Sequence, residues 1–584
     1  MTLHCGGVAD ADPAVVADVV ARAEDAGLRV VSAATVAVAF GDERVGVARD
    51  DDGSFLVLDG EAFPVASPDD MAARVLAAVR AARNDVAFEG VATWWDARRG
   101  EVSVFPDQVG TAPAMWGRAG RSIVWSSHPR DLLVLGVPPE PDPEAVALLA
   151  GLGFVPPPVW YLRGTAAVPP GRMLRWRPDG EPDLVTWFVH RSTPPTPGDA
   201  DAQADVIGAE LVRAVEQRAS GGRLGLFLSA GIDSTAVATV LRRILDLPVE
   251  TFTFRYLGYE GKHNEDEFAA ETARTLGAPH TTIPIGPDEV VARFSDIVRS
   301  YGTPLTFGLH SFKQDAVRDA GIEVMLSGVD AGGWYPYERL GSIASALWRL
   351  PTAARLRALD IAARLQRVPK VRAAYWGALL ANNGIDNEYL PRAVRSELVG
   401  PEAADSAARR VSDALGRFAV DLAAEPAAHR ATLASEVIVL YDAEWNRRWG
   451  RVFGYPIRMP FFDPALALAI DRRRPWDDGK APLRRFVARH LDHERAYAPK
   501  IHQEMPLAQW LRGPLRDFGR DTLSRERVDR AGVVAYEPVR RLLDEHDAGI
   551  DRRWPLWQLM TAVEWALQLR ERGRDAAPAL APRR

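Results

Sequence analysis

The sequence predicts a mixed α/β protein in two parts: an α+β domain over residues 1–190, and an α/β domain over residues 200–570 with a parallel sheet and a large helical lobe. Three observations lead to this class. Short apolar stretches alternate with turn residues through the first part. A strand, a helix and a second strand then follow one another as a βαβ unit, which is typical of a parallel sheet. Residues 344–440 are rich in Ala, Leu and Arg with few strand signals, which indicates helices.

The length and composition restrict the possible classes of protein. A chain of 584 residues is too long for one ordinary hydrophobic core, so we expect two to four domains, of which two are the main ones. Apolar residues make up 47% of the chain and charged residues 26%, which argues against a disordered, fibrous or membrane protein. The net charge of −7 gives no basic field for nucleic acid, so an anionic ligand such as ATP needs a local binding site.

The cysteine content and the N-terminus bear on location. Cys5 is the single cysteine, which excludes an internal disulfide and a cysteine-rich metal site. Residues 1–12 lack the basic and apolar regions of a signal peptide, and no apolar run reaches the roughly 18 residues of a membrane span. We therefore expect a cytoplasmic protein without a membrane-spanning segment.

The first part ends in a segment suited to be a linker. Apolar stretches such as Phe55–Leu58 and Ile123–Trp125 lie between Gly, Asp, Ser and Pro residues, as strands between turns do. Residues 192–199 are polar and rich in proline, which favours an extended linker. We place the domain boundary there.

The second part opens with alternating helical and strand patterns. Ala202–Ala219 has helical apolar spacing, and Leu224–Leu228 is a short apolar run typical of a buried strand. Apolar residues from Ala236 to Leu245 recur at three- and four-residue spacing, which predicts the next helix. Val249–Phe254 then has the pattern of a second strand, which completes the βαβ unit.

The segment between the first of these strands and its helix has the composition of a phosphate loop. Unpaired amide N–H groups and the positive end of a helix meet at such a junction and attract an anion. Ser229, Ser234 and Thr235 add hydroxyl donors. Gly231 lets a phosphate approach the backbone, and Asp233 can hold Mg²⁺ against that phosphate. A plain strand-to-helix turn with a serine cap is the alternative, and it would explain Ser234 alone.

Residues Leu226–Thr235 resemble the SGGxDS pyrophosphate loop of the N-type ATP pyrophosphatases. This group includes asparagine synthetase, β-lactam synthetase and the lasso peptide cyclases. Ala230 stands where the family has its first glycine, and a residue with a Cβ would be strained there if the position required positive φ. The resemblance implies ATP and Mg²⁺ as the cofactors of an adenylating enzyme.

Further segments resemble the asparagine synthetase family, and they follow the family's own order along nearly the whole chain. Each segment is short, so the order carries more weight than any one match. The segments, with the family motifs that they resemble, are Asp59–Phe63 (NGEIYN), Trp95–Arg98 (WDARR), Asp107–Gly110 (DRFG), Gly153–Pro156 (GYVP), Val168–Gly171 (LPPG), Arg458–Asp463 (RVPFLD), and Pro499 and Lys500 with Pro506–Leu511 (RPKxGF, then P and WL).

The resemblance implies an N-terminal domain like the Ntn hydrolases, similar to a class II glutamine amidotransferase. The glutaminase of this family uses an N-terminal cysteine whose own α-amine acts as the base. Here Thr2 would follow the initiator Met, and Cys5 would become N-terminal only after further processing. Asp59 and Gln108 also replace the family's asparagine and arginine. We therefore expect a degenerate glutaminase domain that is retained as a scaffold.

The resemblance also implies which residues bind the nucleotide. Leu228 and Phe254 should flank the adenine, although they could equally be core residues at the ends of strands. Gly328 should lie against the nucleotide. Asp330 is the nearby carboxylate that could join Asp233 as a Mg²⁺ ligand. A turn residue before two glycines is the alternative for Asp330, because the family's acidic pattern is altered here.

Two further residues are catalytic candidates. Lys500 aligns with the family's lysine that faces the α-phosphate and the developing oxyanion. Glu444 aligns with a glutamate that helps to deprotonate the attacking amine in β-lactam synthetases. A solvated helix glutamate, or an ion pair with Arg447 or Arg448, is the alternative for Glu444.

Without a glutaminase no ammonia is delivered, so the substrate itself should supply the amine. The favoured function is that of a lasso peptide cyclase, which joins an Asp or Glu side chain of a precursor peptide to the N-terminal amine of that peptide through an acyl-adenylate. Trp334, Tyr335 and Tyr337, with Trp445 and Trp449, favour a substrate larger than an amino acid, although aromatic residues are more often core.

Two other functions stay open at this point. The alternative enzyme is a β-lactam synthetase-like or other small-molecule amide synthetase. The alternative of another class is a catalytically inactive scaffold that binds a peptide or a partner. The sequence also leaves open whether a leader-binding protein and a leader peptidase work beside this chain.

Overall fold

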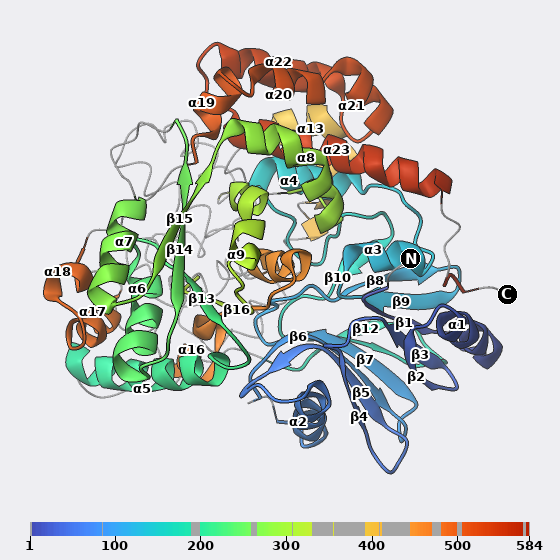
Figure 1. The fold of residues 1–584 in the computed structure, drawn as a ribbon. Coiled ribbons are helices and arrows are strands. Elements are labelled where there is room, and N and C mark those ends of the chain that lie inside the picture. Colours follow the sequence, from blue (N-terminus) through green and yellow to red (C-terminus); the bar gives the residue numbers. More distant parts are fainter. Residues whose placement is uncertain are drawn as a thin grey trace.

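The computed structural model describes residues 3–83, 86–188, 199–258, 265–305, 308–329, 354, 392–407, 409–410, 444–469, 480–498, 505–575 and 580–582. These residues form two packed parts (Figure 1). The strands of the first part lie at the lower right of the view, the parallel sheet lies to their left, and the C-terminal helices cross the top. The mixed α/β class and the parallel sheet expected from the sequence are confirmed. The domain bounds 1–190 and 200–570 stay predictions.

Two antiparallel sheets, each of six strands, make up most of the first part. One sheet has the order β10-β8-β9-β1-β3-β2, and the other has the order β12-β11-β7-β6-β5-β4. The strands are β1 (Cys5–Ala9), β2 (Arg29–Ala33), β3 (Val36–Phe40), β4 (Gly46–Arg49), β5 (Phe55–Ala62), β6 (Phe88–Asp96), β7 (Glu101–Pro106), β8 (Met115–Ala119), β9 (Ser122–Ser126), β10 (Thr165–Ala167), β11 (Arg172–Trp176) and β12 (Asp183–Thr186).

Helices cover the outer faces of these two sheets, which pack against each other face to face. Val38 and Trp125 of one sheet share a buried cluster with Phe55 and Val104 of the other. Helix α2 (Pro68–Arg80) covers the outside of the second sheet. The outside of the first sheet is covered by α1 (Pro13–Asp25) and α3 (Pro129–Val134), and α4 (Pro143–Leu152) follows α3 along the chain. Strands such as β3 and β6 are buried along their whole length because both faces of their sheets are covered.

A parallel sheet with the order β15-β14-β13-β16-β17 forms the centre of the second part. Its strands are β13 (Leu224–Phe227), β14 (Glu250–Tyr256), β15 (His280–Ile285), β16 (Val324–Ser327) and β17 (Ile457–Arg458). The two strands predicted from the sequence are β13 and β14, and α6 (Ile232–Thr239) connects them as expected. β17 comes from far along the chain and pairs in parallel with β16.

Helices surround the parallel sheet. The helices of the second part include α5 (Ala200–Arg218), α7 (Glu265–Leu276), α8 (Pro287–Tyr301), α17 (Ala481–Ala488), α22 (Tyr536–Asp547) and α23 (Arg553–Asp575), together with helical residues 444–453. Within the predicted helical lobe, α13 (Arg392–Val399) is helical, and most of residues 344–440 lie outside the described residues. Among the helices that the structure describes, none is long and apolar enough to cross a membrane.

Buried ion pairs join the two parts. The Arg218 side chain at the end of α5 is 1% exposed, and it binds Glu89 of β6 and Asp463 after β17, each at 3.0 Å. Its guanidinium also lies 3.9 Å from the centre of the Phe63 ring. Burial raises the pKa of Glu89 to about 7, although Arg218 opposes that change. Arg218 therefore holds two carboxylates that come from opposite parts of the chain.

We predict different costs for the two ends of the Arg218–Glu89 pair. Arg218→Met leaves Glu89 and Asp463 buried without their shared cation, so it should lower the free energy of unfolding by about 3–5 kcal/mol. Glu89→Gln should cost only about 1 kcal/mol, because a carboxyl with a pKa of about 7 is already half protonated at pH 7. Urea unfolding of the two variants measures the difference, and equal costs would contradict the role given to Arg218.

Candidate active site

The loop between β13 and α6 is held in shape by its own hydroxyl groups. The Ser229 N–H donates to Ser234 Oγ at 3.0 Å, and the Gly231 N–H donates to Ser229 Oγ at 3.1 Å. The two Oγ atoms are 2.9 Å apart. Gly231 is the residue that caps α6, so the simple serine cap considered from the sequence is wrong. The loop is a network of serine hydroxyls and amides at a helix N-terminus.

Ala230 causes no backbone strain in this loop. Ala82 and Asp246 are the only described residues other than glycine that have positive φ, so Ala230 adopts an ordinary backbone conformation. The Ala230 N–H donates to Glu265 Oε1 at 3.1 Å. A carboxylate oxygen therefore lies on a loop amide, in the role that a phosphate oxygen would take there.

Gly328 packs directly against the first turn of α6. β16 pairs with β13 in parallel, with Ser327 opposite Phe227, so the residue after β16 lies beside the phosphate loop. A Cβ on Gly328 would lie 2.6 Å from both the N and the Cα of Ser234. No side chain fits at that distance unless the loop moves. The sequence places Gly328 at the nucleotide site, and the structure places it against the loop that should form this site.

Asp233 has a cationic partner that the sequence analysis missed. Lys480 Nζ lies 2.7 Å from Asp233 Oδ1 and 2.5 Å from Oδ2. Both side chains are about four-fifths buried, and Lys480 stands immediately before α17. The ammonium group binds both oxygens of the carboxylate that we expect to hold Mg²⁺. The loop thus carries an anionic oxygen on one amide and a cation on its aspartate.

One signal in the sequence could have pointed to Lys480. Only five of the 71 Lys and Arg residues are lysines, so this chain uses arginine at nearly every basic position. A compact, strongly hydrated ammonium differs from a guanidinium fork in how it meets phosphates and carboxylates. Lysine is therefore a residue to consider wherever it falls in or beside a phosphate-binding motif, as Lys480 and Lys500 do.

The expected adenine-flanking residues lie at the carboxyl ends of their strands and are buried. Leu228 is 2% exposed and Phe254 is 6% exposed. The Phe254 ring lies 4.7 Å from that of His310, and burial lowers the pKa of His310 to about 4, so this imidazole is neutral at pH 7. His310 Nε2 is 2.7 Å from the Tyr256 hydroxyl. The core alternative for Leu228 and Phe254 agrees with this burial, and adenine contact stays a prediction.

The match with a known family covers this whole arrangement. A family model described as asparagine synthase matches residues 207–568, which is more than half of the chain. The chain belongs to the asparagine synthase family. This is a family of ATP-dependent ligases that form amides. The match begins within α5 and ends within α23, so the phosphate loop, Gly328 and Lys480 all lie inside it.

Individual relatives in this family are distant. Proteins of Mycobacterium tuberculosis and Mycobacterium bovis that carry the provisional name asparagine synthetase (glutamine-hydrolysing) are 25% identical over 516 residues, which cover 81% of this chain and 75% of theirs. Asparagine synthetase 1 (glutamine-hydrolysing) of Bacillus subtilis is 25% identical over 264 residues, or 44% of this chain and 41% of that one. A solved PRPP amidotransferase of B. subtilis, in complex with ADP and GMP, shares 12% identity over 59% of this chain and 77% of its own. Its TM-score of 0.21 is too low to indicate a shared fold.

In this asparagine synthase family member, Cys5 is neither N-terminal nor accessible. Leu3 precedes it and is 1% exposed, and the Cys5 backbone N–H donates to Asp131 Oδ2 at 3.0 Å. The thiol is buried, and burial together with the nearby Asp59 and Asp131 raises its pKa well above the usual range. The amine and the thiolate that a glutaminase of this kind needs are both missing from this geometry.

Asp59 forms an ion pair with an arginine from the second part of the chain. Arg451 of helical residues 444–453 binds Asp59 Oδ2 at 2.6 Å, and it also donates to Ser127. Burial alone would raise the pKa of Asp59, but Arg451 and Arg447 outweigh it and lower the pKa. Gln108, the other replaced residue, is buried and donates to Val86 O at 2.7 Å. Both replacements have structural partners.

The remaining candidates from the sequence have different outcomes. Glu444 is paired with Arg448, one turn further along, as the ion-pair alternative expected, and its catalytic role is untested. Trp445 is 5% exposed and packs 4.9 Å from Tyr301, so it belongs to the core. The candidates that lie outside the described residues are Asp330, Lys500, Trp334, Tyr335 and Tyr337.

We predict that Cys5 does not react with a disulfide reagent such as DTNB in the folded protein at about pH 8, because its thiol is buried and its pKa is raised. When the protein is unfolded in guanidinium chloride, its reaction with DTNB should release one equivalent of thionitrobenzoate per chain, since Cys5 is the single cysteine. Rapid stoichiometric labelling without denaturant would contradict the buried position.

Proposed function

We propose that this asparagine synthase family member uses ATP to adenylate a carboxylate and then joins it to an amine that the substrate carries. The observation that supports adenylation is the cluster at the phosphate loop. Glu265 lies on the Ala230 amide, Lys480 lies on Asp233, and Gly328 keeps the first turn of α6 close to β16. These groups offer amide donors to a polyphosphate and a carboxylate to a divalent cation, so they fit ATP and Mg²⁺.

The chemical need for this site comes from the leaving group. An amine cannot displace oxide from a carboxylate at neutral pH. Transfer of AMP from ATP to the carboxylate releases pyrophosphate, and attack by the amine then releases AMP and forms the amide. Bound Mg²⁺ would neutralise phosphate charge. The residues proposed for ATP are Leu228, Ser229, Gly231, Asp233, Ser234, Phe254 and Gly328, with Asp233 and Asp330 for the metal, Lys500 and Glu444 as catalytic residues, and Lys480 as an added phosphate-site residue.

A substrate-borne amine is the part of the proposal that the first domain supports. Cys5 is buried, and Asp59 is engaged in an ion pair with Arg451. We therefore propose that glutamine supplies no ammonia here. The finer proposal is a lasso peptide cyclase with a precursor peptide as substrate and, as further proposed partners, a leader-binding protein and a leader peptidase. An inactive scaffold is favoured by two sequence features, Ala230 and the altered segment around Asp330. Ala230 causes no backbone strain, and Asp330 lies outside the described residues.

We predict that the protein converts ATP to AMP and pyrophosphate when a linear peptide with a free N-terminal amine and an internal Asp or Glu is present. The peptide should lose one molecule of water, which mass spectrometry detects. Added glutamine should change neither rate nor product. ADP formation would contradict adenylation, whereas AMP formation with a different acid, and none with peptides, would contradict only the cyclase proposal.

We predict that Lys480→Met lowers adenylation by about a hundredfold, the scale of losing one preorganised cation at a phosphate. Asp233→Asn should abolish turnover at ordinary Mg²⁺ concentrations. Part of the lost activity should return at high Mg²⁺, because this substitution weakens a metal ligand. Pyrophosphate release measures both variants. Lys313→Met is the matched control, since Lys313 pairs with Glu289 on α8 at 3.1 Å. Equal activity of Lys480→Met and wild type would exclude Lys480 from the site.

A further inference from the structure

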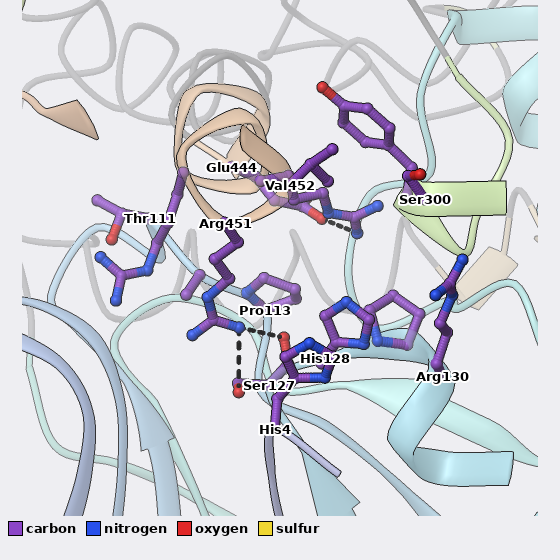
Figure 2. Close-up of a pocket in the computed structure, with 15 residues that line it drawn as sticks. His4, Thr111, Pro113, Ser127, His128, Arg130, Ser300, Glu444, Arg451 and Val452 are labelled. Carbon is purple, nitrogen blue, oxygen red and sulfur yellow. Dashed lines mark hydrogen bonds and ion pairs between the residues drawn. The ribbon is translucent and has the colours of Figure 1, made fainter. Parts of the chain in front are cut away.

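A cavity of about 220 Å³ lies between the first part and helical residues 444–453. His4, Ser127 and His128 line it from the first part, while Arg447 and Arg451 line it from the helix. Figure 2 shows Arg451 extending from the helix toward Ser127, with His4 and His128 beside the same point. No residue of the phosphate loop lines this cavity, although Glu444, proposed above as a catalytic residue, does.

The cationic side chains of this cavity are unequally compensated. Four arginines line the cavity. Arg448 is paired with Glu444, Arg451 is paired with Asp59, and Arg130 has an interaction of its own. Arg447 differs from Arg448 and Arg451. Over the ranges that the structure describes, its hydrogen bond is a long one of 3.4 Å from Nη2 to the backbone oxygen of Asp59, and its Nε is buried without a partner.

The surroundings of Arg447 disfavour its charge. Burial and then Arg451 lower the pKa of Arg447, and the carboxylates of Asp59, Glu89 and Glu61 do not reverse that shift. A buried guanidinium without a paired carboxylate is costly, because its desolvation is not repaid. Arg447 is therefore a cation that an incoming anion would stabilise.

His128 supplies a second unpartnered group at the same cavity. It is 9% exposed, and its Nδ1 is buried without a hydrogen-bond partner in the described part of the chain, 3.8 Å from the nearest Asp131 oxygen. Burial, followed by His4 and Arg451, lowers the pKa of His128 well below its usual range. A neutral imidazole of this kind can donate one hydrogen bond to an anion.

A metal ion does not suit these histidines, although ligand atoms of His4, His128 and Asp131 lie within 4.8 Å of one another. The two imidazole rings are stacked at 4.1 Å and inclined by 24°, so their nitrogen lone pairs run side by side and do not converge on one point. Asp131 already accepts hydrogen bonds from the backbone of His4 and Cys5. The adjacent arginines would also repel a cation.

We propose that this cavity binds a carboxylate, with Arg447 as the charged donor. One unmatched guanidinium balances one negative charge, which favours a monocarboxylate over a phosphate dianion. The planar fork of an arginine also matches the two oxygens of a carboxylate. This site includes no residue of the phosphate loop, so it would exist in a chain that cannot adenylate as well.

The test is calorimetric titration of the full chain with sodium propionate, and with inorganic phosphate at equal ionic strength. We expect saturable propionate binding in the millimolar range. Arg447→Met should weaken it by about tenfold or more, the loss of one charge-assisted hydrogen-bonded pair. Arg44→Met is the matched control, because Arg44 pairs with Asp42 and lines the neighbouring cavity, and its binding should equal that of wild type.

Several outcomes would overturn the proposal. These are absence of saturable propionate binding, phosphate binding at least as tight as propionate, or unchanged binding by a folded Arg447→Met. A crystal of the wild-type chain soaked in 3-bromopropionate gives an answer that does not depend on any variant folding. An anomalous bromine peak in the cavity, with the carboxylate on Arg447, is expected, and a peak only elsewhere would count against the site.

Discussion

The buried Arg218 side chain holds together segments that are remote in the sequence. Arg218 is the last residue of α5, and its guanidinium binds Glu89 in the first part and Asp463 after β17. Asp463 closes the segment that resembles the family's RVPFLD motif, and Arg458 at the start of that segment binds Glu61 at 2.7 Å. The charged residues at both ends of the motif, Arg458 and Asp463, thus form ion pairs with residues of other elements. Because these charges are buried, each needs its partner, which fixes one relative position of the two parts.

This constraint reaches the phosphate loop through the parallel sheet. β17 pairs with β16, β16 pairs with β13, and the loop follows β13. Gly328 continues β16 and contacts Ser234 with no space for a Cβ. The separation of β16 from α6 is therefore set by a glycine and by the register of the sheet, and the loop hydroxyls then complete the local geometry.

The parts of this structure that depend on neighbouring residues could be predicted from the sequence. The strand, loop and helix of residues 224–239 were predicted because their apolar period and small residues are local signals. The pairing of Glu444 with Arg448 could be anticipated for the same reason, since one helical turn separates them. The class of the fold followed from the βαβ pattern.

Contacts across long stretches of sequence could not be predicted in this way. Lys480 meets Asp233 across 247 residues, and Arg451 meets Asp59 across 392. No period or spacing relates such positions, and only the folded topology brings them together. The burial of Trp445 shows the opposite error, because an aromatic residue that might contact a ligand is more often part of the core.

Helical residues 444–453 face two regions at once. Trp449 donates to Ser311 Oγ at 2.8 Å, next to the His310 ring that contacts Phe254, while Arg451 binds Asp59 in the first part. A helix this short moves as one rigid unit. A shift of Arg451 therefore also displaces Trp449, and a shift of Trp449 displaces Arg451. Any ligand that repositions this helix must therefore act on both sides, and linkage requires the mutual effect on affinity to be equal in each direction.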